Sequence, residues 1–148
     1  MSDPIVTIEL VQRQDYAFDA RYGAGIADLR VDEPAPLGQG TGPSPVQSLA
    51  TAVGNCLSAS LLFALRKYKQ SPDPMRTEVT AEVGRNADKR LRVLQITARL
   101  HLGVPAASLE HLDRVLAQFE GFCTVTESIR QGIPVAVEVY DSTGERLK

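Results

Sequence analysis

The sequence has no tryptophan and only two cysteines, two histidines and two methionines among its 148 residues. Two cysteines are too few for a scaffold that depends on several disulfides. A chain of this length can bury a hydrophobic core without help from disulfides or metals. Nothing in the sequence requires a second domain, so we expect a single domain over residues 1–148.

A strong charge of either sign is also missing. The formal net charge is -2 and the basic residues are scattered, so the sequence predicts no surface for nucleic acid. The chain does not open with a basic segment followed by an apolar one, and no apolar run is both long and free of polar residues. We therefore expect no membrane partner and a cytoplasmic location, where thiols are kept reduced.

Charged residues are absent altogether from residues 34–65. Within this segment, Ser44 at the N-cap, Pro45 at the first helical position and Gln47 at the third predict a helix that begins with a capping box. Apolar residues recur on several sides of this helix, which predicts burial on most of its surface. One small sheet cannot cover such a helix, so we predict a homodimer whose two sheets wrap a pair of helices, each spanning Ser44 to Lys69.

Alternating apolar residues predict strands on both sides of the central helix. Three strands precede it, a hairpin follows it, and a last strand comes after two further helices. The order βββ-α-ββ-α-α-β, with strands joined in hairpins, predicts an α+β fold with antiparallel sheets. The alternating residues are Val6, Ile8 and Leu10; Tyr16, Phe18, Ala20 and Tyr22; Ala27, Leu29 and Val31; Thr77, Val79, Ala81 and Val83; Leu94, Ile96, Ala98, Leu100 and Leu102; and Val135, Val137 and Val139.

The two helices before the last strand have their own start and stop residues. After Pro105, apolar residues at helical spacing predict one continuous helix that Gly121 caps. A second capping box is predicted from Thr124 at the N-cap and Glu127 three residues later, opening a short helix that ends at Gly132.

The two cysteines occupy different positions on these elements. Cys56 lies about three turns into the central helix, beyond the reach of the positive helix end. Cys123 comes directly before the Thr124 N-cap, where free backbone N–H groups favour a thiolate. If the two thiols meet, a peroxide can oxidise one to a sulfenic acid and the other can condense with it to a disulfide. The alternative is that both are small apolar core residues.

Other chemistries of cysteine and histidine fit the spacing less well. His101, His111 and the two cysteines show neither the CxxC nor the HxxxH spacing of zinc ligands, so we predict no metal site. A cysteine hydrolase or acyltransferase needs a histidine base, and only His101, on a predicted strand, is placed to supply one. A histidine on a strand is more often structural. No motif calls for a cofactor.

Two segments resemble the motifs of the OsmC/Ohr family, named after osmotically inducible protein C and organic hydroperoxide resistance protein. Residues 42–61, GPSPVQSLATAVGNCLSASL, are similar to a turn of the form Gly-x-(Asn/Ser)-Pro that opens a cysteine-bearing helix. Residues 122–139, FCTVTESIRQGIPVAVEV, resemble the second motif, with Thr124 and Thr126 where the family usually has Pro and Ser. The resemblance covers nearly the whole chain. It implies antiparallel sheets wrapped around long central helices in an intertwined homodimer, with two sites at the subunit interface.

The resemblance also implies a function, that of a thiol-dependent peroxidase acting on organic hydroperoxides. By position, Cys56 matches the cysteine that attacks the peroxide and Cys123 the resolving cysteine. A dithiol would reopen the disulfide, and in the organic-hydroperoxide branch that reductant is a lipoyl group on a protein. The alternative is an OsmC-like dimer that keeps the fold and binds a small apolar ligand without catalysis.

The sequence departs from the family pattern at the residues that assist the attacking thiolate. In better-known branches a glutamate follows the turn and helps an arginine hold that thiolate, but Val46 stands at this position here. Residues 32–43 contain no arginine, so the assisting arginine must come from elsewhere. The departures indicate a divergent subgroup, although a nearby cation alone lowers a thiol pKa. The candidate arginines are Arg13, Arg21 and Arg30.

Overall fold

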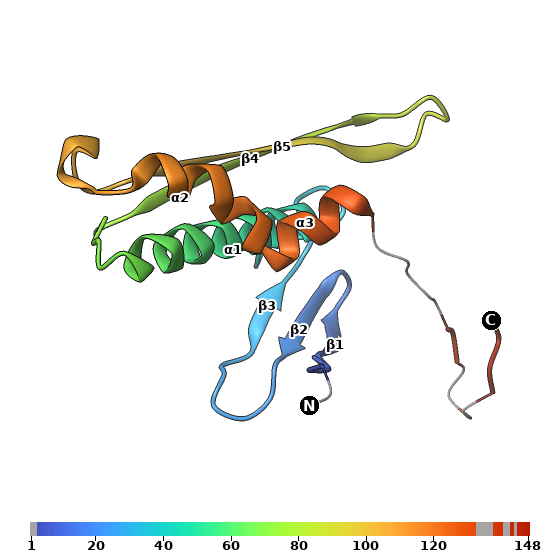
Figure 1. The fold of residues 1–148 in the computed structure, drawn as a ribbon. Helices are drawn as coiled ribbons and strands as arrows, with labels where there is room; N and C mark the ends of the chain where they lie inside the picture. Colours follow the sequence, from blue (N-terminus) through green and yellow to red (C-terminus); the bar gives the residue numbers. More distant parts are fainter. Residues whose placement is uncertain (1–2, 133–137, 141–142, 144) are drawn as a thin grey trace.

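The computed structural model of the chain describes residues 3–132, 138–140, 143 and 145–148. Its strands form two antiparallel sheets, one of order β1-β2-β3 and one of order β4-β5. The long helix α1 lies between the two sheets, and α2 and α3 run beside it (Figure 1). The α+β class is confirmed. The predicted last strand, residues 135–139, falls mostly outside the described residues.

The element bounds follow the predicted order closely. The strands and helices are β1 Glu9–Gln14, β2 Ala17–Arg21, β3 Leu29–Val31, α1 Pro45–Lys67, β4 Arg76–Arg85, β5 Leu91–His101, α2 Leu112–Gln118 and α3 Thr124–Gln131, with 3-10 turns η1 Ala106–Ser108 and η2 Phe119–Phe122. The first strand begins later than predicted, because Val6 and Ile8 precede β1 and are exposed.

The start of α1 is set by the capping box that the sequence predicts. The Gln47 backbone N–H donates to Ser44 Oγ at 3.2 Å, and the Ser44 N–H donates to Gln47 Oε1 at 2.9 Å. Pro45 occupies the first helical position, where its missing N–H costs nothing. The capping box is therefore confirmed, and it fixes the residue at which the charge-free helix begins.

One side of α1 forms the core together with α2, η2 and the β4-β5 hairpin. Gly54 faces β4 at its closest approach, since a Cβ there would stand 2.7 Å from Val79 Cγ2. The absence of a side chain thus lets the helix settle onto the strand. The buried core residues are Val53, Leu57, Leu61, Leu65, Val115, Phe119 and Cys123.

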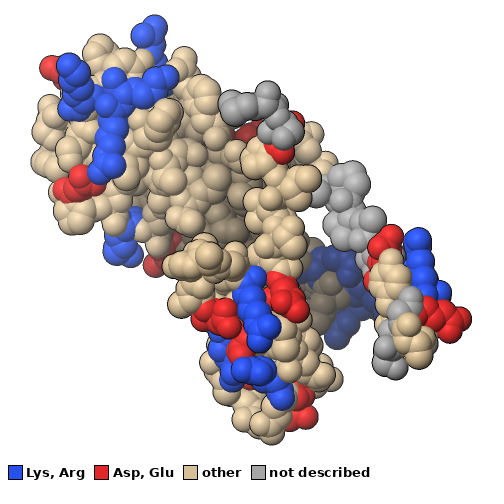
Figure 2. Space-filling model, turned by 90° about the horizontal axis from the view of Figure 1, so that it is seen from below, with Lys and Arg blue, Asp and Glu red and all other residues tan. Residues whose placement is uncertain are grey.

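The other side of α1 is left uncovered by the chain. Ala52, Asn55 and Ala59 are exposed, and Phe63 is 63% exposed. By length and composition α1 is apolar enough to cross a membrane, contrary to our expectation from its polar residues, and only 28% of its most apolar 18-residue stretch is buried. Figure 2 shows a broad uncharged area between charged groups gathered toward the ends of the molecule. The core helix of a soluble protein meets the same length and composition criteria.

The segment after Pro105 differs from the continuous helix predicted there. It is divided into η1, α2 and η2, and His111 at the start of α2 has a left-handed backbone with φ 61°. The His111 ring packs on Tyr68 with centroids 4.6 Å apart, and the Glu110 N–H donates to Gln70 Oε1 at 3.0 Å. These contacts with the end of α1 divert the backbone, so tertiary packing overrides the helical pattern. Gly121 lies within η2 and does not cap a longer helix.

Candidate active site

The structure brings the two cysteines together although 66 positions separate Cys56 from Cys123 in the numbering of the chain. Cys56 is half-buried on the flank of α1 that packs against the core cluster, and Cys123 belongs to that cluster with 0% of its surface exposed. Cys56 is a neighbour of the Cys123 sulfur and helps to lower the pKa of that thiol. Both thiols are free.

Cys123 is itself the N-cap of α3, one residue earlier than the cap predicted from the sequence. The predicted capping box of Thr124 and Glu127 is therefore wrong: Thr124 is the first helical residue, and the Glu127 N–H donates to the Cys123 carbonyl at 3.0 Å. The reason is that the buried Cys123 sulfur, rather than a threonine hydroxyl, faces the first turn of the helix.

Two hydroxyl side chains also contact this sulfur. Cys123 Sγ and Thr126 Oγ1 lie 3.1 Å apart within hydrogen-bond geometry, and Thr126 is only 7% exposed. Ser60, one turn beyond Cys56 on α1, also lowers the pKa of this sulfur. The Thr126 backbone N–H acts in the same direction, although the Cys123 side chain makes no capping hydrogen bond at the start of α3. Groups on both α1 and α3 thus favour the charged form of the sulfur.

These contacts shift the pKa of Cys123. Burial alone would raise the pKa of the thiol, because it disfavours the charged form. The hydrogen bonds from Cys56, Thr126 and Ser60 together outweigh burial, so the pKa of Cys123 lies below its ordinary value. A thiolate at Cys123 is therefore stabilised mainly by neutral donors.

Sequence reasoning missed Ser60 and Thr126 as members of this site. Each has a weak sequence signal: Ser60 is four residues after Cys56 on one helix face, and Thr126 occupies the third helical position after the cap. Neither signal is specific, because hydroxyl residues are common on both helices.

The three candidate arginines do not contact the cysteines within the chain. Arg13 Nε and Arg30 Nε lie 2.6 Å and 2.5 Å from the two carboxylate oxygens of Asp19. Arg21 lies 3.8 Å from each of two other carboxylates. All three belong to the β1-β2-β3 sheet, which stands apart from α3 (Figure 1). The pKa of Asp19 is lowered, first by its hydrogen bond to Arg30.

The histidines are also remote from the candidate chemistry. His101 is exposed at the end of β5, and His111 packs on Tyr68. Neither is among the main groups that act on the Cys123 sulfur. Within the part of the chain that the structure describes, no three His, Cys, Asp or Glu side chains are grouped closely enough to hold a metal ion.

The loop that leads into α1 is held by Asp32. Its carboxylate accepts the N–H groups of Glu33, Gln39 and Thr41 at 2.8, 3.2 and 3.1 Å, and the Thr41 hydroxyl at 2.9 Å. The pKa of Asp32 is lowered, first by the hydrogen bond from the Thr41 backbone. The carboxylate therefore stabilises the folded loop only while it is ionised.

This predicts a pH-dependent contribution of Asp32 to stability. A carboxyl whose folded pKa is depressed contributes fully above its unfolded pKa of about 3.9, and the contribution is lost as the pH falls through the folded value. We expect Asp32→Asn to lower the free energy of unfolding at pH 7, and the difference from the parent to shrink toward pH 3. Urea denaturation at both pH values measures it, with the exposed Asp28→Asn as control; an equal deficit at both would contradict the account.

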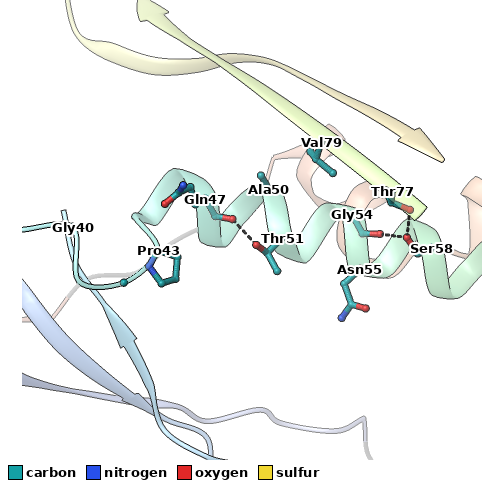
Figure 3. Close-up of a pocket in the computed structure, with 11 residues that line it drawn as sticks. Gly40, Pro43, Gln47, Ala50, Thr51, Gly54, Asn55, Ser58, Thr77 and Val79 are labelled. Atoms are coloured by element: carbon teal, nitrogen blue, oxygen red, sulfur yellow. Dashed lines mark hydrogen bonds between the residues drawn. The ribbon is translucent and has the colours of Figure 1, made fainter. Parts of the chain in front are cut away.

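A groove of about 970 Å³ lies away from the cysteines, between α1, β4 and the loop that leads into α1 (Figure 3). Its walls carry both polar and apolar side chains, none of them charged, and neither cysteine lines it. The Ser58 hydroxyl lies 2.6 Å from both the Gly54 carbonyl and Thr77 Oγ1, while Asn55 points away from β4. The lining residues are Gly40, Gly42, Pro43, Gln47, Ala50, Thr51, Gly54, Asn55, Ser58, Thr77 and Val79.

A second groove, of about 670 Å³, lies between α1, β5 and α3. Leu49, Val53 and Leu57 line it from α1, and Ile96 lies opposite on β5. Thr126, the hydrogen-bond partner of Cys123, also lines this groove. This largely aliphatic groove, which Glu120 and Arg130 also line, thus reaches the residue next to the buried sulfur, but neither cysteine lines it.

Comparison with known proteins places these features in a family. The family model for OsmC-like protein matches residues 38–138. No curated protein sequence gives a significant match. Among solved structures, an OsmC-like protein from Mycoplasma pneumoniae is similar with a TM-score of 0.70 and 15% identity, covering 89% of this chain and 91% of that one.

Two further structures show the same fold at low sequence identity. An OsmC-like protein from Vibrio cholerae aligns with a TM-score of 0.69 and 14% identity over 86% of this chain and 94% of that one. The organic hydroperoxide resistance protein OhrB of Bacillus subtilis aligns with a TM-score of 0.64 and 19% identity, over 87% and 94% of the two chains. At such identities the likeness establishes the fold alone.

Proposed function

Because the chain belongs to the OsmC-like protein family, we propose that it is a thiol-dependent peroxidase that reduces organic hydroperoxides through Cys56 and Cys123. The observation that carries this proposal is the meeting of the two thiols between α1 and α3, where Cys56 is close enough to help lower the pKa of Cys123. The fold shared with an organic hydroperoxide resistance protein supports it.

The exposure of the two sulfurs divides their roles. Cys56 is half-buried and can meet a substrate, whereas Cys123 is fully enclosed. Cys56 gives up its proton to solvent and attacks the terminal oxygen of a hydroperoxide as a thiolate. The O–O bond breaks, the alkoxide takes up a proton and leaves as an alcohol, and Cys56 becomes a sulfenic acid. Cys123 then displaces water from that sulfenic acid, and the disulfide forms.

The groove between α1, β5 and α3 supports an organic rather than an inorganic substrate. Its lining is mainly aliphatic and includes Thr126 beside Cys123, so it could hold the alkyl part of a hydroperoxide near the site, although Cys56 itself does not line it. A dithiol, such as a lipoyl group on a protein, would return the disulfide to two thiols. Residues 1–148 would act as one domain in the cytoplasm, where dithiol reductants are available.

We further propose that the protein works as a homodimer. The exposed side of α1 is apolar and uncharged, and a second copy of the chain would bury it. Cys56 lies at the margin of that side, so the partner subunit would border the site. An arginine from the partner, Arg13, Arg21 or Arg30, could then approach Cys56, provided that it leaves its carboxylate.

Intact mass spectrometry tests the proposed reaction. We expect one equivalent of tert-butyl hydroperoxide to remove two hydrogen atoms from the protein and to yield one tert-butanol, with peptide mapping locating a disulfide between Cys56 and Cys123. The principal alternative is an OsmC-like dimer that only binds a small apolar ligand. An unchanged mass, or scattered oxidation to sulfonic acid, would favour that alternative.

A further inference from the structure

The two sulfurs of the proposed disulfide differ in their exposure to solvent and in the groups that stabilise negative charge on them. Cys56 lies half-exposed on α1, and Cys123 has no exposed surface. Thiol–disulfide exchange depends on which sulfur the incoming thiolate can reach and on how well the other sulfur carries negative charge as it leaves. The accessibility of the attacked sulfur and the stability of the leaving thiolate can therefore be compared between Cys56 and Cys123.

The support for negative charge is concentrated on Cys123. Thr126 Oγ1 lies 3.1 Å from its sulfur, the Thr126 N–H belongs to the first turn of α3, and Ser60 reaches it from α1. Thr126 itself is only 7% exposed, although it also lines the groove between α1, β5 and α3. This set of partners joins two helices and holds the sulfur in one place.

Charged side chains do not account for the stabilisation of negative charge on the Cys123 sulfur. The charge-free segment of residues 34–65 includes all of α1 that faces Cys123. The charged side chains nearest in sequence to Cys123 pair with one another, because Arg130 in the last turn of α3 contacts both Glu120 and Glu127. The hydroxyl groups are thus the side chains that distinguish Cys123 from Cys56.

We propose that the reducing dithiol attacks the sulfur of Cys56, and that Cys123 departs as a thiolate held by Thr126 and Ser60. Thr126 is then a positioning residue that fixes the direction of reduction. This inference rests on the proposed function for the disulfide it starts from, and it adds the order in which the two sulfurs are released.

The electron and proton balance of the step is simple. One thiolate of the dithiol forms a bond to Cys56, the bond between Cys56 and Cys123 breaks, and the electron pair stays on Cys123. The second thiolate of the reductant then attacks the reductant sulfur that is bonded to Cys56 in the mixed disulfide. Cys56 leaves as a thiolate and takes up a proton, while the dithiol becomes a disulfide.

Trapping the mixed disulfide tests the direction. The parent protein is oxidised with diamide, treated briefly with glutathione as the probe, quenched with acid and alkylated with N-ethylmaleimide. Trypsin places Cys56 and Cys123 in separate peptides, 31–66 and 115–130. We expect glutathione on Cys56 and the maleimide on Cys123. The reverse pattern, or an equal mixture, would overturn the proposal.

Variants test the part played by Thr126. We expect Thr126→Val to slow reduction of the diamide-made disulfide by about threefold to tenfold. In a Cys56→Ser background, the same change should move the thiolate absorbance of Cys123 to higher pH. Thr126→Ser should restore both properties. Thr124→Val, the same change two positions earlier on α3 at an exposed residue, should alter neither; equal effects of the two valine variants would reject the assigned role.

The use of diamide separates this inference from the proposed function. If the protein fails to consume hydroperoxides but glutathione is found on Cys56, the peroxidase proposal fails and the direction of exchange stands. If diamide forms no disulfide between the two cysteines, the inference itself is overturned.

Discussion

Cys56→Ser is expected to lower the rate of organic hydroperoxide consumption by at least about a thousandfold, because a serine hydroxyl is scarcely ionised near neutral pH and is a far weaker nucleophile than a thiolate. Cys123 cannot replace it, since its sulfur is completely enclosed in the described structure. The measurement is the disappearance of tert-butyl hydroperoxide in the presence of a dithiol. Turnover within a few-fold of the parent would remove Cys56 from its role.

The structure provides a matched control for this substitution. Asn55→Ser introduces the same side chain at the neighbouring position, and Asn55 lines the groove on the other flank of α1. We expect this variant to keep at least half of the parental rate. Both variants should elute in size-exclusion chromatography like the parent. A dimer lost only in Cys56→Ser would mean that its inactivity reports on assembly rather than on chemistry.

The elements whose sequence signals are local could be predicted well. Ser44, Pro45 and Gln47 form a complete capping box within four residues, and the structure has the same bonds. The hairpin of β4 and β5 follows equally from its alternation of apolar residues. Such signals depend only on neighbours along the chain, so they remain valid whatever the rest of the fold does.

The errors arise where distant contacts decide the backbone. The contacts of Glu110 and His111 with the end of α1 interrupt a sequence that has helical spacing on both sides. At α3, Thr124 is a better N-cap by propensity than Cys123. Burial of the Cys123 sulfur against α1 nevertheless places the helix start one residue earlier.

The candidate site was predicted only in part for the same reason. The meeting of Cys56 and Cys123 was expected from a resemblance, whereas Ser60 and Thr126 depend on how α3 lies against α1. The pairing of Arg30 could have been predicted from the residues, because Asp19 stands directly opposite it across β2 and β3. That register explains why the arginine has a carboxylate partner in its own sheet rather than a thiolate.

Removal of the second cysteine should produce a different defect from removal of the first. We expect Cys123→Ser to consume roughly one equivalent of hydroperoxide per chain and then to stop, even with a dithiol present, because no partner thiol converts the Cys56 sulfenic acid into a disulfide.

Excess hydroperoxide distinguishes the two proteins further. The parent treated without reductant should end as a disulfide and gain no oxygen, whereas Cys123→Ser should gain two or three oxygen atoms at Cys56 as sulfinic or sulfonic acid. Intact mass and mapping of peptide 31–66 give both results. Sustained rapid turnover of Cys123→Ser with a dithiol would show that the reductant resolves the sulfenic acid directly and that Cys123 is not required for resolution.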